Sequence, residues 1–177
     1  MNVSYKQHLE KLQEYLSTKG WDTLLETPDE VRFYTRLEVR LYTVLEGQNR
    51  YWPVELAFLP NLENDLKGFS LLQCYVPVIA DVPASANDSL SSMIAIINPK
   101  LAIGQFGLLT QHSLFCFKHN TILENENIEG SYGALNEMLN MIHYLLESFH
   151  EAFLGVIKGE MTVQESIGSL PFKEIYD

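Results

Sequence analysis

The feature that most constrains the fold of this chain is a long alternation of apolar and polar residues between Val31 and Glu46. A period of two places successive side chains on opposite faces, which is the pattern of a β-strand with one face buried and one in solvent. Residues 27–30 are also a good helix start, but the β-branched and aromatic residues of the run and its unbroken alternation favour the strand. The chain is therefore expected to build a sheet with one covered face.

Three other segments carry apolar residues at helical spacing. The first ends at Gly20, a common C-terminal stop, and the second ends before Pro99, which cannot continue a helix. The third is the clearest helix in the sequence, and residues 162–165 beyond it match a capping box for a short helical turn. The expected helices cover residues 4–19, residues 90–97 with a cap at Asp88 or Ser89, and residues 132–154.

The remaining apolar runs predict strands. A turn at residues 46–49 joins the first two, and residues 69–79 are too densely apolar for a solvated face, which indicates a central strand. Pro77 argues that pairing ends near the far end of that strand. The expected strands cover residues 31–45, 51–59, 69–79, 102–109 and 113–119.

The order helix, three strands, helix, two strands, helix predicts an α+β fold, α-β-β-β-α-β-β-α, in which helices cover an antiparallel sheet. The length of 177 residues fits one domain, which we place at residues 1–159. The tail, residues 160–177, contains Leu170, Phe172 and Ile175 and is too apolar for an idle terminus. We expect it to dock on the domain or on a neighbouring copy.

The net charge of the chain indicates which classes of partner to expect, and its two cysteines indicate the cellular compartment. The 12 Lys and Arg against 23 Asp and Glu give a net charge of −11, which repels a phosphate backbone or an anionic membrane, so neither nucleic acid nor membrane is an expected partner. The start of the chain lacks the features of a secretory signal, and residues 71–80 are about half of the roughly 20 apolar residues of a membrane helix. Cys74 and Cys116 lie in apolar runs, which indicates buried, reduced thiols in the cytoplasm.

One helix flank offers the spacing of a metal site. His143, Glu147 and His150 are spaced i, i+4 and i+7, and two imidazoles with a carboxylate can bind zinc. Nothing nearby supplies a fourth ligand, and half-exposed His and Glu are common beside an apolar stripe. We therefore expect no catalytic residue, no cofactor and no metal, with a small metal-dependent hydrolase on this flank as the alternative.

Arginine and tyrosine interleave on the polar face of the first strand. Both types are enriched in protein interfaces, and this face therefore suggests a docking surface for an acidic or amphipathic segment of a partner. The alternative is a solvated sheet face. The expected partner-binding residues are Arg32, Tyr34, Arg36, Arg40 and Tyr42.

The helix at residues 90–97 carries apolar residues almost all round, whereas a helix that covers one sheet needs a single apolar stripe. The remaining face is costly to leave in water, and a symmetric copy is a common cover. The alternative is that the turn at residues 61–68 or the C-terminal tail covers it. The sequence therefore predicts a homodimer through Leu90, Met93, Ile94, Ile96 and Ile97.

The end of that helix and the strand after it carry a local motif. Residues 93–98 read Met-Ile-Ala-Ile-Ile-Asn, and residues 103–108 read Ile-Gly-Gln-Phe-Gly-Leu. This is similar to the helix ending in Asn and the following Gly-x-Phe strand of YbjN-like bacterial sensory transduction regulators, and the element order resembles the type III secretion chaperone fold. The resemblance implies a dimeric, non-enzymatic, chaperone-like adaptor or regulator that holds a segment of a partner polypeptide.

Overall fold

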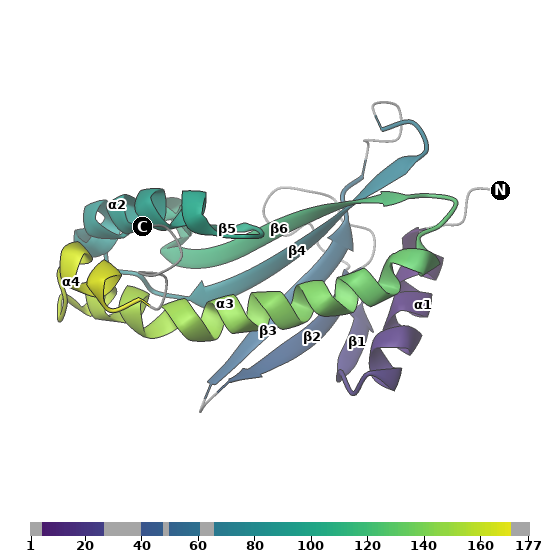
Figure 1. Ribbon diagram of the computed structural model, residues 1–177, viewed down its shortest axis with the longest axis horizontal. Helices are drawn as coiled ribbons and strands as arrows, with labels where there is room; N and C mark the ends of the chain where they lie inside the picture. The colour runs from purple at the N-terminus through teal and green to yellow at the C-terminus, as the bar shows by residue number, and fades with distance from the viewer. Residues whose placement is uncertain (1–4, 27–39, 48–49, 61–65, 171–177) are drawn as a thin grey trace. The chain divides into compact units, whose positions relative to one another are not determined.

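The computed structural model describes residues 5–26, 40–47, 50–60 and 66–170, with only the backbone at residues 40–42. The fold is α+β, as predicted, with strand order β1-β2-β3-β4-β6-β5 in one six-stranded sheet (Figure 1). Its elements are α1 (Tyr5–Thr18), β1 (Thr23–Glu26), β2 (Arg40–Gly47), β3 (Arg50–Phe58), β4 (Phe69–Ile79), α2 (Asn87–Ile97), β5 (Gln105–Leu109), β6 (Leu114–Glu124), α3 (Tyr132–Lys158) and α4 (Val163–Gly168).

The chain divides into two compact units. Unit 1 comprises Met1–Val76 and His119–Leu139, and unit 2 comprises Pro77–Lys118 and Asn140–Asp177. Three long elements, β4, β6 and α3, begin in one unit and end in the other. The single domain over residues 1–159 stays a prediction.

The first helix ends as its sequence predicts. Its buried residues are Leu9, Leu12 and Leu16, on one stripe, together with His8. Gly20 adopts a φ of 88°, in the left-handed region that glycine enters without steric cost. The N–H of Trp21 donates to the carbonyl of Leu16 at 3.1 Å, and the N–H of Gly20 donates to that of Ser17 at 3.1 Å, which is the hydrogen-bond pattern of a Schellman motif.

The next strand, β1, was not predicted. It has four residues, and its Cα partners in β2 are the residues from Arg40 to Thr43. The Thr43 hydroxyl also donates to the carbonyl of Asp22 at 2.8 Å, which holds the entry of β1 against β2. A segment this short shows too few alternations for a periodicity argument, so its pairing with β2 makes it a strand.

The predicted alternation is confirmed in the part of β2 whose side chains are described. Thr43 and Leu45 are buried, while Val44 and Glu46 are exposed. Gly47 pairs with Arg50 across the hairpin to β3, and residues 48–49 of the predicted turn lie outside the described residues. Residues 31–39 of the expected strand lie outside the described residues.

The third predicted strand is confirmed with its bounds and its central place. β4 lies between β3 and β6 in the strand order, and its register with β3 runs from Leu72 to Tyr75. The following two strands differ from the prediction in length, because β5 begins only after Gly104 and β6 continues to Glu124.

Unit 2 is built around an aromatic core. Phe106 of β5 lies 5.3 Å from Phe115 of β6 and 4.8 Å from Phe153 of α3, measured between ring centroids. The Phe115 and Phe153 rings are 4.4 Å apart. Around this core, α2 packs against β5 and α4 (Figure 1).

The motif that carried the family resemblance has a structural role in unit 2. The Asn98 amide donates to the Phe106 carbonyl at 2.9 Å and accepts from the Phe106 N–H at 2.8 Å, so it joins the end of α2 to β5. Gly104 has a φ of 64°, and a Cβ atom there would lie 2.2 Å from Cζ of Phe117. Both residues thus serve the turn between helix and strand.

The predicted capping box is confirmed at the start of α4. The Thr162 hydroxyl accepts from the Glu165 N–H at 3.2 Å, and the Glu165 carboxylate accepts from the Thr162 N–H at 2.8 Å. Beyond it, Ser166 is fully buried and donates to the carbonyl of Ala152 at 2.7 Å. Leu170 is also buried, whereas Phe172 and Ile175 of the expected tail lie outside the described residues.

Candidate functional site

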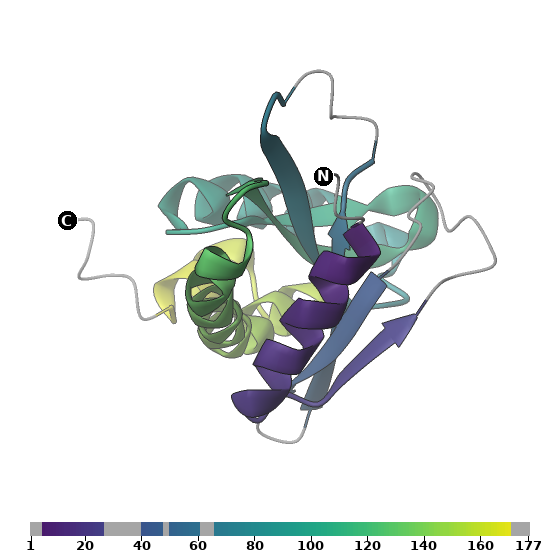
Figure 2. The same ribbon diagram turned by 90° about the vertical axis from the view of Figure 1, so that its right-hand side faces the viewer.

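One face of the sheet in unit 1 is covered by α1. Leu45, Trp52, Val54 and Phe58 point to this face and are buried. The ring of Tyr5 on α1 stacks on Phe58, with centroids 4.7 Å apart. Figure 2 shows α1 in front of the strands that it contacts, β1 and β2. Among the described residues, the large apolar side chains on the opposite face of the same strands are exposed.

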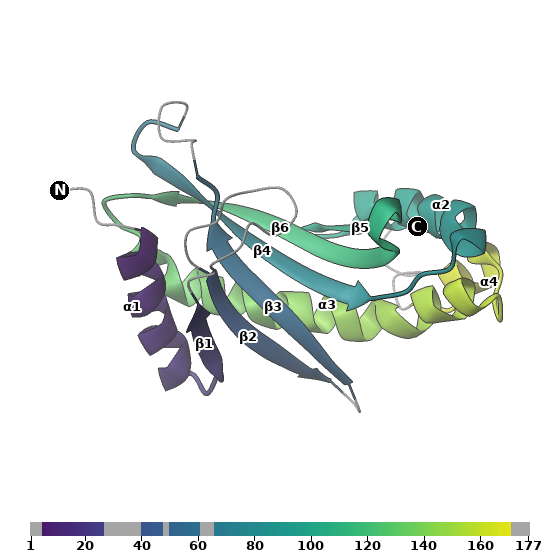
Figure 3. The same cartoon turned by 180° about the vertical axis from the view of Figure 1, so that it is seen from behind.

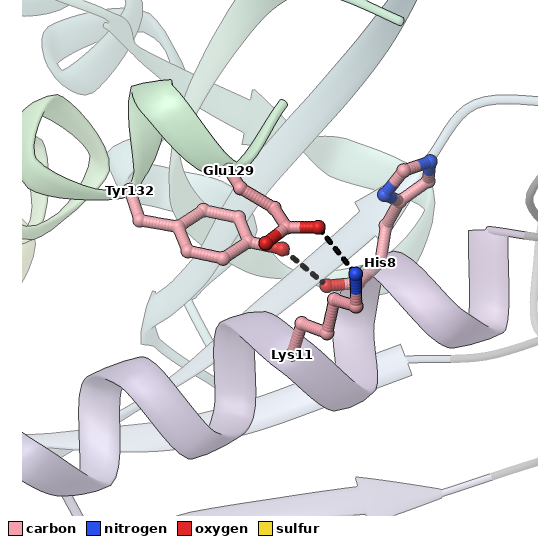
Figure 4. Close-up of polar contacts among 4 residues, drawn as sticks. All are labelled: His8, Lys11, Glu129 and Tyr132. Carbon is pink, nitrogen blue, oxygen red and sulfur yellow. Dashed lines mark hydrogen bonds and ion pairs between the residues drawn. The ribbon is translucent and has the colours of Figure 1, made fainter. Parts of the chain in front are cut away.

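Contacts between α1 and the start of α3 hold the covering helix in place. The Tyr132 hydroxyl donates to the carbonyl of His8 at 3.1 Å, and Lys11 forms an ion pair with Glu129 (Figure 4). At the end of α1, the Trp21 indole N–H donates to Oδ1 of Asn136 at 2.9 Å. No sequence pattern linked these residues, because they lie more than a hundred positions apart.

His8 is the titratable group with the most constrained surroundings in this cluster. Its side chain is buried and tilts against Phe58, with centroids 6.1 Å apart, and its Nδ1 has no hydrogen-bond partner among the described residues. Burial lowers the pKa of His8, the neighbouring Lys11 lowers it further, and Glu129 raises it. The imidazole is therefore neutral at neutral pH and packs as part of the covered face.

The side of the unit 1 strands opposite α1 is here called the open face (Figure 3). The alternation in β2 and β3 assigns its members there, and a hydrogen bond of 3.1 Å from Gln73 to Asn120 places the outward residues of β4 and β6 on the same side. Its large apolar side chains are unusually exposed: Tyr51 at 70%, Ile122 at 62%, Leu24 at 56%, Phe69 at 44% and Val44 at 41%.

The register makes part of this face continuous. Val44 pairs with Pro53, and Glu46 pairs with Tyr51, so these side chains are cross-strand neighbours on β2 and β3. Leu24 lies on β1 opposite Tyr42, which makes it a diagonal neighbour of Val44. Exposed apolar residues therefore occur on three adjacent strands, β1, β2 and β3.

The charged side chains that the structure describes on the open face are acidic, while the Cα partner of Glu26 on β2 is Arg40. At the outward positions of unit 1 whose side chains the structure describes, the charged residues are Glu26, Glu46, Glu55 and Glu124. Glu26, Glu46 and Glu124 are exposed, and Glu55 is half-buried opposite Tyr75. The described part of the face thus combines exposed apolar side chains with exposed glutamates.

The partner-binding residues predicted from the sequence are only partly within the described chain. Arg32, Tyr34 and Arg36 lie outside it. Arg40 and Tyr42 belong to β2, where their Cα partners on β1 are Glu26 and Leu24. Their role in binding stays a prediction.

The predicted dimer surface on α2 needs correction. Leu90 and Met93 are fully buried, and Ile97 is 2% exposed, so these three residues belong to the core of unit 2. The sequence pattern suggested a face left over because it could not show that β5 and α4 both pack against this helix. Only Ile96, at 42% exposure, and the half-buried Ile94 remain available to a second copy.

The predicted metal-like flank does not form a ligand cluster. His143, Glu147 and His150 are half-buried on α3, with 4.0 Å between Nε2 of His143 and Oε1 of Glu147. In the described ranges there is no group of three or more His, Cys, Asp or Glu side chains that could hold a metal ion.

Both cysteines are buried free thiols, as predicted. Burial raises the pKa of Cys74 to about 12, so this thiol stays protonated and is a poor nucleophile. It therefore acts as a small apolar core residue.

Among the residues that the structure describes, no helix has the length and apolar character needed to cross a membrane. Neither the protein-family models nor the curated proteins with which the sequence was compared match it.

Proposed function

We propose that this chain is a non-enzymatic, chaperone-like adaptor or regulator that holds a segment of a partner polypeptide on its open face. The observation that supports the proposal is the group of large apolar side chains exposed on one side of the sheet, from Tyr51 at 70% to Val44 at 41%. Continuous apolar patches on a protein surface are typical of sites that bind other proteins.

The energetics of such a surface favour a bound partner. Complete burial of a large apolar side chain contributes about 1.5–3 kcal/mol, and aromatic residues such as Tyr51 are enriched among the residues that dominate binding. A few of these contacts supply the free energy of a moderate interaction after the cost of ordering the partner. The partner would thereby be kept from aggregating or from acting.

The proposal includes the family, the compartment and the assembly expected from the sequence. A YbjN-like or type III secretion chaperone-like adaptor fits an acidic α+β chain, and buried free thiols at Cys74 and Cys116 fit a reducing cytoplasm. A homodimer on α2 would now use Ile94 and Ile96. Metal analysis of the purified protein separates this proposal from the hydrolase alternative, which requires a stoichiometric metal ion.

A paired-variant experiment tests the binding site. The wild-type chain is used to isolate partners from its native cells, and binding of each partner is then measured with purified proteins. Leu24→Thr with Tyr51→Ser should weaken binding about tenfold or more, because it removes two apolar contacts but keeps residues that strands accept.

The matched control is Met141→Gln, which changes an apolar side chain of 41% exposure on α3 in unit 2. This variant should bind as the wild type does, and circular dichroism should show that all variants are folded. Equal affinity of the double variant and the wild type for every partner would contradict binding on the open face.

A further inference from the structure

The strand β5 forms one edge of the sheet. Among the described strands it is last in the order and pairs with β6 alone. An edge strand has a row of main-chain N–H and C=O groups that can pair with a strand of another molecule, and proteins often protect such an edge with charged residues or proline. The sequence of β5, Gln-Phe-Gly-Leu-Leu, contains neither, so it does not protect this edge by itself.

The side chain of Asn98 occupies part of this edge. Its amide N–H donates to the Phe106 carbonyl at 2.9 Å, and its Oδ1 accepts from the Phe106 N–H at 2.8 Å. Two directly opposite residues exchange the same pair of hydrogen bonds across an antiparallel ladder. Asn98 therefore takes the place that a residue of an added strand would take.

The alternation of the ladder shows which other main-chain groups lie on this edge. Residues of an antiparallel strand alternately direct their main-chain groups toward the paired strand and away from it, so Leu108 directs its groups to the same side as Phe106. Gln105 is exposed, and Gly107 and Leu108 are half-buried, so β5 is not enclosed. A strand added at Leu108 would next reach Phe106, where Asn98 already binds both groups.

The other edge of the sheet has a similar contact. The strand β1 is first in the order, and the side-chain amide of Gln13 on α1 donates to the carbonyl of Thr23 at 3.1 Å. An amide side chain thus binds the main chain of each terminal strand of the described sheet. At Thr23 this amide binds the carbonyl, whereas at Phe106 the amide of Asn98 binds both groups, so Asn98 gives the more complete protection.

We propose that Asn98 is an edge cap that prevents β5 from pairing with the β5 strand of a second copy. A second copy is the partner that fits this edge, because antiparallel pairing of two identical strands about a two-fold axis brings the same uncharged, largely apolar residues together. This inference goes beyond the proposed function, which concerns the open face and α2.

Removal of the cap tests the inference. In the full chain, Asn98→Ala frees both main-chain groups of Phe106, and light scattering at increasing concentration should give a mass at least about twice that of the wild type. Leu108→Pro added to this variant should restore the wild-type mass, because proline has no N–H to donate and is accepted on an edge strand. Gln105→Lys, which places a charge on the edge without changing the main chain, should also reduce the association.

Hydrogen exchange locates the pairing. In dilute Asn98→Ala protein, the amide of Phe106 should exchange about tenfold or more faster than in the wild type, because its acceptor is lost. At high concentration the amides of Phe106 and Leu108 should become protected together as the strands pair. If the alanine variant is unfolded by circular dichroism, Asn98→Asp provides the same measurements, because it keeps an acceptor for the Phe106 N–H and loses the donor to its carbonyl.

A destabilised variant with an intact cap is the matched control. Ser166→Ala removes the hydrogen bond of 2.7 Å from a buried hydroxyl to the Ala152 carbonyl in the same unit, and it should keep the wild-type mass. A wild-type mass of folded Asn98→Ala at every concentration would overturn the inference. An equal increase in mass for Ser166→Ala, or an increase that persists with both Leu108→Pro and Gln105→Lys, would attribute the association to loss of stability and would also overturn it.

Discussion

At the scale of single residues, the clearest roles belong to side chains that form hydrogen bonds with main-chain groups. Asn98 is the best example, because its amide satisfies both main-chain groups of Phe106 on β5, which lies at the end of the strand order. The hydrogen bonds of Asn98 thus give this motif a role in joining the end of α2 to β5.

Substitution of Asn98 should therefore destabilise the chain. Asn98→Ala leaves the N–H and C=O of Phe106 without their partner and is expected to cost about 1–3 kcal/mol in the free energy of unfolding. Urea unfolding measures the change. The control is Ser92→Ala on the exposed side of α2, which should stay within about 0.5 kcal/mol of the wild type. Equal stability of both variants would contradict the role of Asn98.

His8 should make stability depend on pH. Its pKa is lowered in the folded chain, so the unfolded chain binds this proton more tightly, and stability is lost as the pH falls through the unfolded value of about 6.5. Between about pH 7.5 and about pH 5.5, the wild type should lose more stability than His8→Gln, which does not titrate there. Urea unfolding at both pH values gives the comparison, and an equal loss in both proteins would show that His8 does not contribute.

At the scale of elements, the short helix α4 contributes to the fold by packing against α2. The six-residue α4 places the buried Ser166 against the carbonyl of Ala152, with its hydroxyl 3.8 Å from Sδ of Met93 on α2. It packs against α2, and Leu170 directly after it is also buried. Its capping box lets so short a helix form at that place.

Deletion of residues 160–177 should uncover this side of α2. Burial of Met93 and Leu170 is worth about 1.5–3 kcal/mol for each side chain, so the melting temperature should fall by about 5 °C or more and a hydrophobic dye should bind. Deletion of residues 171–177 alone keeps α4 and Leu170, so it separates their contribution from that expected of Phe172 and Ile175. A melting curve unchanged by the longer deletion would show that α4 is dispensable for unit 2.

At the scale of the whole molecule, the unequal numbers of acidic and basic residues shape its associations. The net charge of −11 favours basic partners over nucleic acid and over surfaces of its own kind. A homodimer must therefore form through a surface with little charge, and Ile96 with Ile94 on α2 offers one.

Light scattering at micromolar concentration tests this dimer. The proposal expects a mass of twice the 20.3 kDa of one chain, and Ile96→Asp should shift it to one chain while the circular dichroism spectrum stays the same. Ile122→Asp, at an exposed position of unit 1, is the control and should leave the mass unchanged. A wild-type mass of one chain would exclude the dimer.

Several elements could be predicted from signals that are local in the sequence. The stripe and the Gly20 stop of α1, the alternation of β2, the dense apolar run of β4 and the capping box of α4 all act within a few residues. Part of the open face could also be predicted, since the alternation placed Glu46 in solvent. The same alternation in residues 51–56 could have identified Tyr51 as an exposed residue.

Which strands and helices contact each other could not be predicted from these local signals. The tertiary structure made a strand of residues 23–26, buried three of the five apolar residues expected to form a dimer surface, and joined α1 to α3 through residues far apart in sequence. It also showed that the exposed apolar side chains share their face with exposed glutamates. These features depend on contacts between distant segments, and hydrophobic periodicity identifies an apolar surface without identifying the segment that covers it.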